Sequence, residues 1–297
     1  MTAPTTEDQA GVTTHTLGVP GAEIAYDVRP NEASNEPVLL MIGSPMGAAG
    51  FGSLASHFTD RTVVTYDPRG VERSKRTDGA TRSNPDIHAD DLQRLISALD
   101  RGPVDMFASS GGAINALALV AGHPEQVRTV VAHEPPAATV VPDREVALAA
   151  SRDIHETYLR DGNGPGMAKF IALVMHKGEI PSDWPDQPAP DPQMFGLPTV
   201  DDGTRDDALL AQNLIGTTHY EFDFAALRAA STRIVVGVGE ESEGELARRG
   251  GEAIAERLGV KPVIFPSGHG GFLGGEYGQM GDPDAFAMKL REVLSER

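Results

Sequence analysis

The chain contains no cysteine among its 297 residues. Disulfide bonds, thiolate nucleophiles and cysteine-ligated metals are therefore excluded, and nothing in the composition favours secretion. No apolar run approaches the roughly 18 residues needed to cross a bilayer. The amino-terminal stretch MTAPTTEDQAGV has neither the basic nor the apolar part of a signal peptide. We therefore expect a cytoplasmic protein.

Positive charge is scarce, because 25 Lys and Arg face 43 Asp and Glu, for a net charge of −18. Such a surface repels phosphate backbones and anionic lipids, so neither nucleic acid nor a membrane is an expected partner. The sequence also lacks a metal-ligand cluster and the glycine-rich motifs that bind nucleotides. We expect no cofactor, no metal, and a small-molecule substrate. The oligomeric state stays open, a homodimer included.

Strand-like and helix-like segments alternate between residues 37 and 134. The expected strands span 37–43, 61–67, 104–109 and 127–134, and the expected helices include 85–100 and 111–122. Two further strand-like runs, HTLGV and EIAYDV, flank a turn and predict a hairpin. Alternation with short connections predicts an α/β fold with a doubly wound, mostly parallel sheet. Functional sites in such sheets lie at the carboxyl ends of the strands.

The alternation stops after the fourth parallel strand. Residues 137–228 contain helical segments (143–161, 167–178 and 206–222) and a proline-rich stretch. The strand pattern then resumes at 232–239 and 261–266, with helices at 244–259 and 282–296. We therefore divide the chain into a flexible tail (1–11), a core in two parts (12–136 and 229–297) and a helical lid (137–228).

The stretch FASSGG, residues 107–112, joins an expected strand to an expected helix. A strained strand-to-helix turn can expose a nucleophile, but only if the residues two before and two after it are small. For Ser109 these neighbours include Phe107, which would clash. For Ser110 they are Ala108 and Gly112, which fit. Ser110 is therefore the candidate nucleophile, and the alternative is a pair of serines that only cap a helix.

Five segments, in order, resemble motifs of the α/β-hydrolase superfamily across residues 12–297. They are IGSPMG (42–47), YDPRGVERS (66–74), ASSGGA (108–113), HPEQVRTVVAHEPP (123–136) and SGHGGF (267–272). Two positions depart from the family pattern: Ile42 replaces a histidine, and Glu72 replaces a glycine. The resemblance implies that Ser110 attacks an acyl carbon and that His269 carries its proton. It also implies an oxyanion hole made by the backbone N–H groups of Ser44 and Gly111.

His269 has independent support, because it lies in a glycine-rich loop directly after an expected strand. For the remaining histidines, the sequence context indicates surface or packing positions. We expect surface positions for His15, His57, His88, His123 and His176, helix-surface positions for His155 and His219, and a packing role for His133.

The third catalytic group is an acid that orients the histidine. The resemblance places it most often three residues past Gly239, where this chain has Ser242. The other placement used in the superfamily is the end of the preceding strand, which here offers Glu134, held by two prolines. We therefore favour Glu134, with Glu241 as the alternative acid.

Together these residues predict a cofactor-independent serine hydrolase that cleaves an ester, lactone or thioester through an acyl-enzyme, a carboxylic ester hydrolase in the broad sense. A C–C hydrolase or cyclase would use the same groups, and a non-catalytic ligand-binding protein of the same fold is the other alternative. Apolar side chains in the lid favour a small or medium organic substrate, although most of them are expected to pack the lid onto the core. They are Tyr158, Met167, Phe170, Met175, Trp184, Met194, Phe195, Tyr220 and Phe222.

Overall fold

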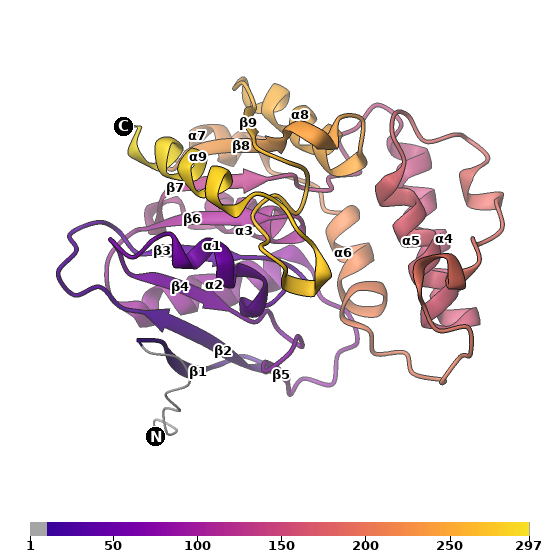
Figure 1. Cartoon of the computed structure of the whole chain (residues 1–297), viewed down its shortest axis with the longest axis horizontal. Coiled ribbons are helices and arrows are strands. Elements are labelled where there is room, and N and C mark those ends of the chain that lie inside the picture. The colour runs from indigo at the N-terminus through magenta and orange to yellow at the C-terminus, as the bar shows by residue number, and fades with distance from the viewer. Residues whose placement is uncertain (1–10, 297) are drawn as a thin grey trace.

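The computed structural model of the chain describes residues 11–296 (Figure 1), so the tail expected over 1–11 lies outside the described residues apart from Gly11. Within them, one sheet has the strand order β1-β2-β4-β3-β6-β7-β8-β9, with β5 beside β2. The strands are β1 (Thr13–Val19), β2 (Ala22–Arg29), β3 (Leu39–Ile42), β4 (Val63–Tyr66), β5 (Lys75–Arg76), β6 (Val104–Ser109), β7 (Val127–His133), β8 (Arg233–Gly239) and β9 (Val263–Phe265).

The pairing of these strands confirms the expected α/β fold with a mostly parallel, doubly wound sheet. β1 and β2 form the expected antiparallel hairpin, and β2 joins β4 antiparallel. Every pairing from β4 through β3, β6, β7 and β8 to β9 is parallel. The carboxyl ends of these parallel strands therefore meet at one edge of the sheet.

Helices connect the strands and cover both faces of the sheet. The α-helices are α1 (Gly52–Ser56), α2 (Pro85–Leu99), α3 (Gly111–Gly122), α4 (Arg144–Asp161), α5 (Asn163–Met175), α6 (Leu214–Thr218), α7 (Phe224–Ala229), α8 (Leu246–Leu258) and α9 (Pro283–Ser295). Shorter helical turns are η1 (Ala48–Phe51), η2 (Pro124–Gln126), η3 (Trp184–Asp186), η4 (Pro192–Phe195), η5 (Ala208–Asn213), η6 (Glu240–Ser242) and η7 (Glu276–Gly278).

Two apolar clusters lie on opposite faces of the sheet. One packs α2, α3, α7 and α8 against the sheet, and its members include Leu92, Leu117 and Ile254. The other packs α1 and α9, which lie in front of the sheet in Figure 1, and its members include Leu54 and Phe286. Helices cover both faces of the sheet, so β3, β4 and β6 are buried along their whole length. This two-sided burial explains why the strands are continuous apolar runs in the sequence.

The helical insertion has its own apolar cluster, built from α4, α5, η5 and α6. The helix expected over 167–178 instead runs from Asn163 to Met175. Its first turn contains Gly164 and Gly166, which precede the expected start of the helix. A Cβ on Gly166 would lie only 2.7 Å from the Cβ of Tyr158, so this glycine allows α5 to pack closely against α4.

The helix expected over 206–222 is also shorter and divided. It consists of η5, a π-helical turn, followed by α6, and it ends at Thr218. Tyr220 and Phe222, which follow it, pack against the apolar cluster of the core. These two side chains therefore help to fasten the insertion to the sheet. Most of the other apolar residues expected to do so pack within the insertion's own cluster or are exposed, because the insertion forms a core of its own.

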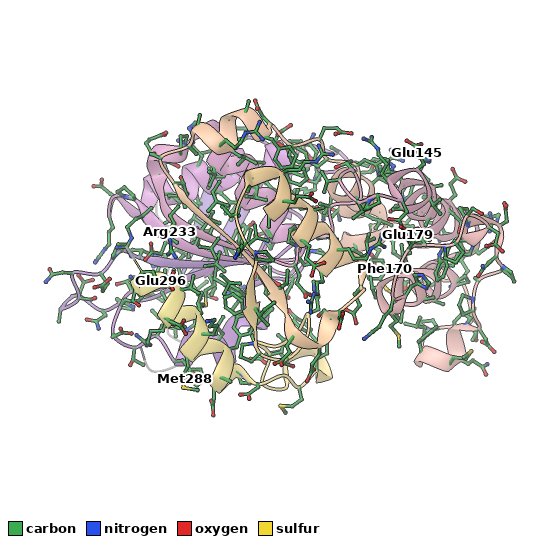
Figure 2. All side chains as sticks on the ribbon, turned by 90° about the horizontal axis from the view of Figure 1, so that it is seen from above. Glu145, Phe170, Glu179, Arg233, Met288 and Glu296 are labelled. Atoms are coloured by element: carbon green, nitrogen blue, oxygen red, sulfur yellow. The ribbon has the colours of Figure 1, made fainter. Side chains whose placement is uncertain are left out.

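Backbone hydrogen bonds also tie the insertion to two segments of the core. On one side, Gly178 N donates to Gly244 O at 2.9 Å, just before α8 begins. On the other, Ser83 N donates to Gln212 O at 2.9 Å, just before α2 begins. Figure 2 shows the insertion at one end of the molecule, marked by Glu145 and Glu179, with Arg233 near the opposite end. None of the helices within residues 11–296 is both long and apolar enough to cross a membrane.

Candidate active site

The turn between β6 and α3 holds Ser110 in a strained conformation. Its φ of 57° lies in the left-handed region that side chains other than glycine rarely adopt. Ser110 N donates to His133 O at 2.9 Å, which fixes the turn against β7. A Cβ on Gly112 would lie 2.8 Å from Ile42 O, so the position after the turn has no room for a side chain. The geometry has the features expected of a nucleophile turn.

The two serines of this turn point to different environments. Ser109 is the last residue of β6, is 2% exposed, and its Oγ lies 3.4 Å from His133 Nδ1 inside the core. Ser110 is partly exposed at the edge of the sheet. The serine accessible to a substrate is therefore Ser110, in the register that the small neighbours predict.

His269 follows β9 and lies beside Glu134, which directly follows β7. His269 Nδ1 is 2.6 Å from Glu134 Oε2, the distance of a short charge-assisted hydrogen bond. The second oxygen of the carboxylate, Oε1, accepts from Gly239 N at 2.7 Å. Glu134 is fully buried and has a φ of 47°, so its backbone is also held in the left-handed region. The structure thus brings together the two residues that the sequence paired as base and acid.

The carboxyl group of Glu134 stays ionised despite its burial. Burial by itself raises the pKa, but the hydrogen bond from His269, the nearby rings of His133 and His269 and the Gly239 N–H lower the pKa to about 2. An ionised carboxylate at Nδ1 keeps the proton on that nitrogen and leaves Nε2 free to accept one.

Glu241, the alternative acid, lies near the same loop but makes a different contact. Its Oε2 accepts from Ser267 Oγ at 3.3 Å, and its backbone N–H donates to Ser267 O. No hydrogen bond joins Glu241 to His269 within residues 11–296. Ser242 is 1% exposed, and its Oγ has no hydrogen-bond partner in the described part of the chain.

Ser44, which follows β3, lies against Gly111, the first residue of α3. A Cβ on Gly111 would be 2.5 Å from Ser44 O, so the two segments touch through their backbones. Neither the N–H of Ser44 nor that of Gly111 donates to an acceptor among the described residues. Two free, fixed donors beside a nucleophile are suited to bind an oxyanion.

Ser110 and His269 are not joined by a hydrogen bond among the described residues. Such bonds are often long in ligand-free enzymes and tighten when substrate binds. The arrangement therefore contains a partly exposed serine, a histidine oriented by a carboxylate and two N–H donors without an acceptor. The serine and the histidine are not hydrogen-bonded to each other.

His133 lies beneath this site and is fully buried. Its ring packs edge-on against Phe265 and Phe286, with centroid distances of 5.7 and 5.2 Å. Burial lowers the pKa of His133 to about 4, so the ring is neutral at pH 7. Besides filling space, the ring faces the hydroxyl of Ser109.

Two histidines expected at the surface are buried instead. His88 is 1% exposed on the inner side of α2, its Nε2 lies 2.9 Å from Asn213 Oδ1, and burial lowers its pKa to about 4. His155 is 6% exposed and bridges Leu210 O and Arg82, at 2.7 and 3.0 Å. The sequence signal was present for His88, because it stands four residues before Leu92 in the apolar stripe of α2.

The described residues contain no group of three or more histidine, aspartate or glutamate side chains arranged to hold a metal ion.

Comparison with known proteins shows the family to which the chain belongs. The sequence model of the alpha/beta hydrolase fold matches residues 36–205. A hydrolase of Bacillus subtilis (strain 168), the uncharacterized protein YraK, is 30% identical over 262 residues, which cover 86% of this chain and 89% of that protein. The chain therefore belongs to the alpha/beta hydrolase fold family, and it is a hydrolase.

Solved structures share the fold at lower sequence identity. A thermophilic esterase from Thermogutta terrifontis superposes with a TM-score of 0.63 at 22% identity, covering 94% of this chain and 96% of that one. The enol-lactonase of Burkholderia xenovorans LB400 superposes with a TM-score of 0.64 at 16% identity, covering 95% of this chain and all of that one.

Proposed function

We propose that the protein is a serine hydrolase that cleaves an ester, lactone or thioester of a small to medium organic molecule through an acyl-enzyme. The observation that carries this proposal is the 2.6 Å contact between His269 Nδ1 and the buried carboxylate of Glu134, next to a serine held at positive φ. Its support from relatives is general, since one similar fold belongs to an esterase and another to an enol-lactonase.

In the proposed mechanism, Ser110 Oγ attacks the acyl carbon while His269 Nε2 accepts the hydroxyl proton. The carbonyl oxygen becomes an oxyanion, which the N–H groups of Ser44 and Gly111 bind. His269 then donates its proton to the leaving alcohol or thiol, and the acyl group stays on Ser110. Water, deprotonated by His269, attacks the acyl-enzyme and releases the acid. Glu134 stays ionised throughout and stabilises the imidazolium.

The helical insertion supplies the cover of the proposed site. Backbone hydrogen bonds join it to Gly244, which lies between β8 and α8, and to Ser83, which precedes α2. We propose that its apolar side chains bind the organic part of the substrate. Met167 and Phe170 are half-buried against the insertion's own cluster and leave part of their surface available.

The first test is reaction with a fluorophosphonate, read by intact mass. The proposal expects a single adduct on the wild type and on Ser109→Ala, and none on Ser110→Ala. An adduct that depends on Ser109 would contradict the choice of nucleophile. A panel of esters, lactones and thioesters then identifies the bond that is cleaved.

One observation favours the non-catalytic alternative, namely the open contact between Ser110 and His269 among the described residues. If the fluorophosphonate labels none of the three proteins, the site binds a ligand without forming an acyl-enzyme, and the hydrolytic mechanism is wrong.

A further inference from the structure

Glu72 and Tyr277 are distant in sequence but form one hydrogen-bonded pair. Tyr277 Oη donates to Glu72 Oε1 at 2.9 Å, across 205 residues. Both residues have positive φ, 47° for Glu72 and 53° for Tyr277, and Glu72 stands where the family motif has glycine. Side chains other than glycine rarely adopt this conformation, so it persists only where its surroundings enforce it.

Both side chains pack onto the segment Gly43–Gly50, which we call the oxyanion loop because it carries Ser44. A Cβ on Gly47 would lie 2.8 Å from Glu72 Cδ, and a Cβ on Gly50 would lie 3.1 Å from Tyr277 Cε2. The carboxylate and the phenol ring therefore rest directly on the loop backbone at two points. Burial and the neighbouring carboxylate of Glu72 raise the pKa of Tyr277, so its hydroxyl stays protonated and remains a donor.

The segment that carries Tyr277 also touches the loop of the catalytic histidine. Glu276 Oε1 accepts from Ser53 N at 2.7 Å, just after the oxyanion loop ends. A Cβ on Gly270, next to His269, would lie 3.0 Å from Gln279 Oε1. The segment Glu276–Gln279 thus contacts both the loop that carries His269 and the segment around the oxyanion loop. The hydrogen bond from Tyr277 joins it to Glu72 as well.

We propose that the Glu72–Tyr277 pair is a positioning device that sets the Ser44 N–H at the distance the oxyanion requires. The inference rests on the proposed function. An oxyanion donor acts only over a few tenths of an ångström, so a small displacement of the loop reduces catalysis while leaving substrate binding largely intact. Because both residues are exposed and touch no catalytic side chain, their effect passes through the loop backbone.

Three variants separate positioning from stability. Tyr277→Phe removes only the hydroxyl, Glu72→Gly removes the carboxylate but relieves the strain at positive φ, and Glu72→Gln keeps an oxygen that accepts from Tyr277. We expect Tyr277→Phe and Glu72→Gly to reduce kcat for p-nitrophenyl acetate, and the rate of Ser110 phosphonylation, about tenfold with KM within twofold. Glu72→Gln should stay within twofold of the wild type, and Glu72→Gly should keep or raise the Tm.

Glu32→Gln is the control for the loss of one exposed side-chain hydrogen bond. Glu32 follows the end of β2 that pairs with the start of β4, and its Oε1 accepts from Arg101 at 2.7 Å, away from the oxyanion loop. This variant should leave kcat unchanged. If the wild type labels normally but Tyr277→Phe and Glu72→Gly keep full rates, the positioning inference is wrong and the proposed function stands. If kcat and the rate of phosphonylation fall only in variants whose Tm also falls, the pair has a structural role and the inference is wrong as well. If the wild type itself fails to label, both proposals fall.

Discussion

Replacing Glu134 by glutamine tests the acid of the proposed triad, which follows β7 and not β8. The amide keeps the size of the side chain but removes its charge, and its NH₂ group can favour the wrong tautomer of His269. In a serine protease the corresponding loss reduces kcat about 10⁴-fold, which is about 5.5 kcal/mol. We expect a fall of about 10³–10⁴-fold in kcat for Glu134→Gln, with KM within a few-fold of the wild type.

The same variant should change how stability depends on pH. A pKa of about 2 against the ordinary 4.5 corresponds to about 3 kcal/mol of favourable interaction in the folded state. This carboxyl titrates below its unfolded value, so its contribution is complete above pH 4.5 and is lost as pH falls through about 2. Urea unfolding between pH 7 and pH 2 should therefore show a wild-type advantage that disappears at the acidic end.

Glu241→Gln is the control for both measurements, because this carboxylate contacts Ser267 in the histidine loop without reaching His269. It should retain at least a third of the wild-type kcat. The reasoning is refuted if Glu134→Gln keeps its activity, or if Glu241→Gln loses activity to the greater extent. In the second case the acid is Glu241, and the 2.6 Å contact of Glu134 is structural.

Three further substitutions test neighbouring parts of the argument. Gly112→Ala should lower the free energy of unfolding in urea by about 2–4 kcal/mol, because its Cβ would lie 2.8 Å from the backbone of β3. Gly122→Ala in the same helix is the control: its Cβ would meet nothing within 4 Å, so the free energy of unfolding should not fall. His88 has its pKa lowered to about 4, so its neutral form stabilises the fold above pH 6.5 and that contribution falls as pH drops towards 4. The variant His88→Gln should flatten the stability curve over this window by up to about 1.4 kcal/mol per pH unit. Introducing Ser242→Asp into Glu134→Gln should recover at least tenfold in kcat in the ester assay, and no recovery would mean that the loop after β8 holds a carboxylate out of reach of His269.

Much of the core was predictable because local pattern and tertiary environment agree. The strands between 37 and 134 are apolar throughout, since helices cover both faces of the sheet, and that burial leaves a continuous signal in the sequence. Ser110 was selected by steric reasoning on Ala108 and Gly112, and the close approach of Gly112 to β3 has the same physical origin.

The misses come from contacts between distant segments. The helix α5 begins before the expected Met167, and the glycines of its first turn lie where a Cβ would not fit, Gly164 against Pro198 and Gly166 against Tyr158. His88 reads as a surface residue until Asn213, 125 residues later, supplies its hydrogen bond. The pairing of Glu72 with Tyr277 is beyond any local pattern, because two exposed polar residues carry no hydrophobic period.

The placement of Glu134 at the end of β7 has a consequence for how the molecule divides its tasks. If the acid belongs to β7, the turn after β8 supplies no carboxylate to His269. That turn and the residues after it serve as a docking platform instead: Gly244 pairs with Gly178 of the insertion, and Arg249 of α8 donates to Gly178 O at 2.7 Å. Under the proposed function, substitutions there change how the insertion packs against the core without touching Ser110, His269 or Glu134, so substrate range and catalytic chemistry can evolve separately.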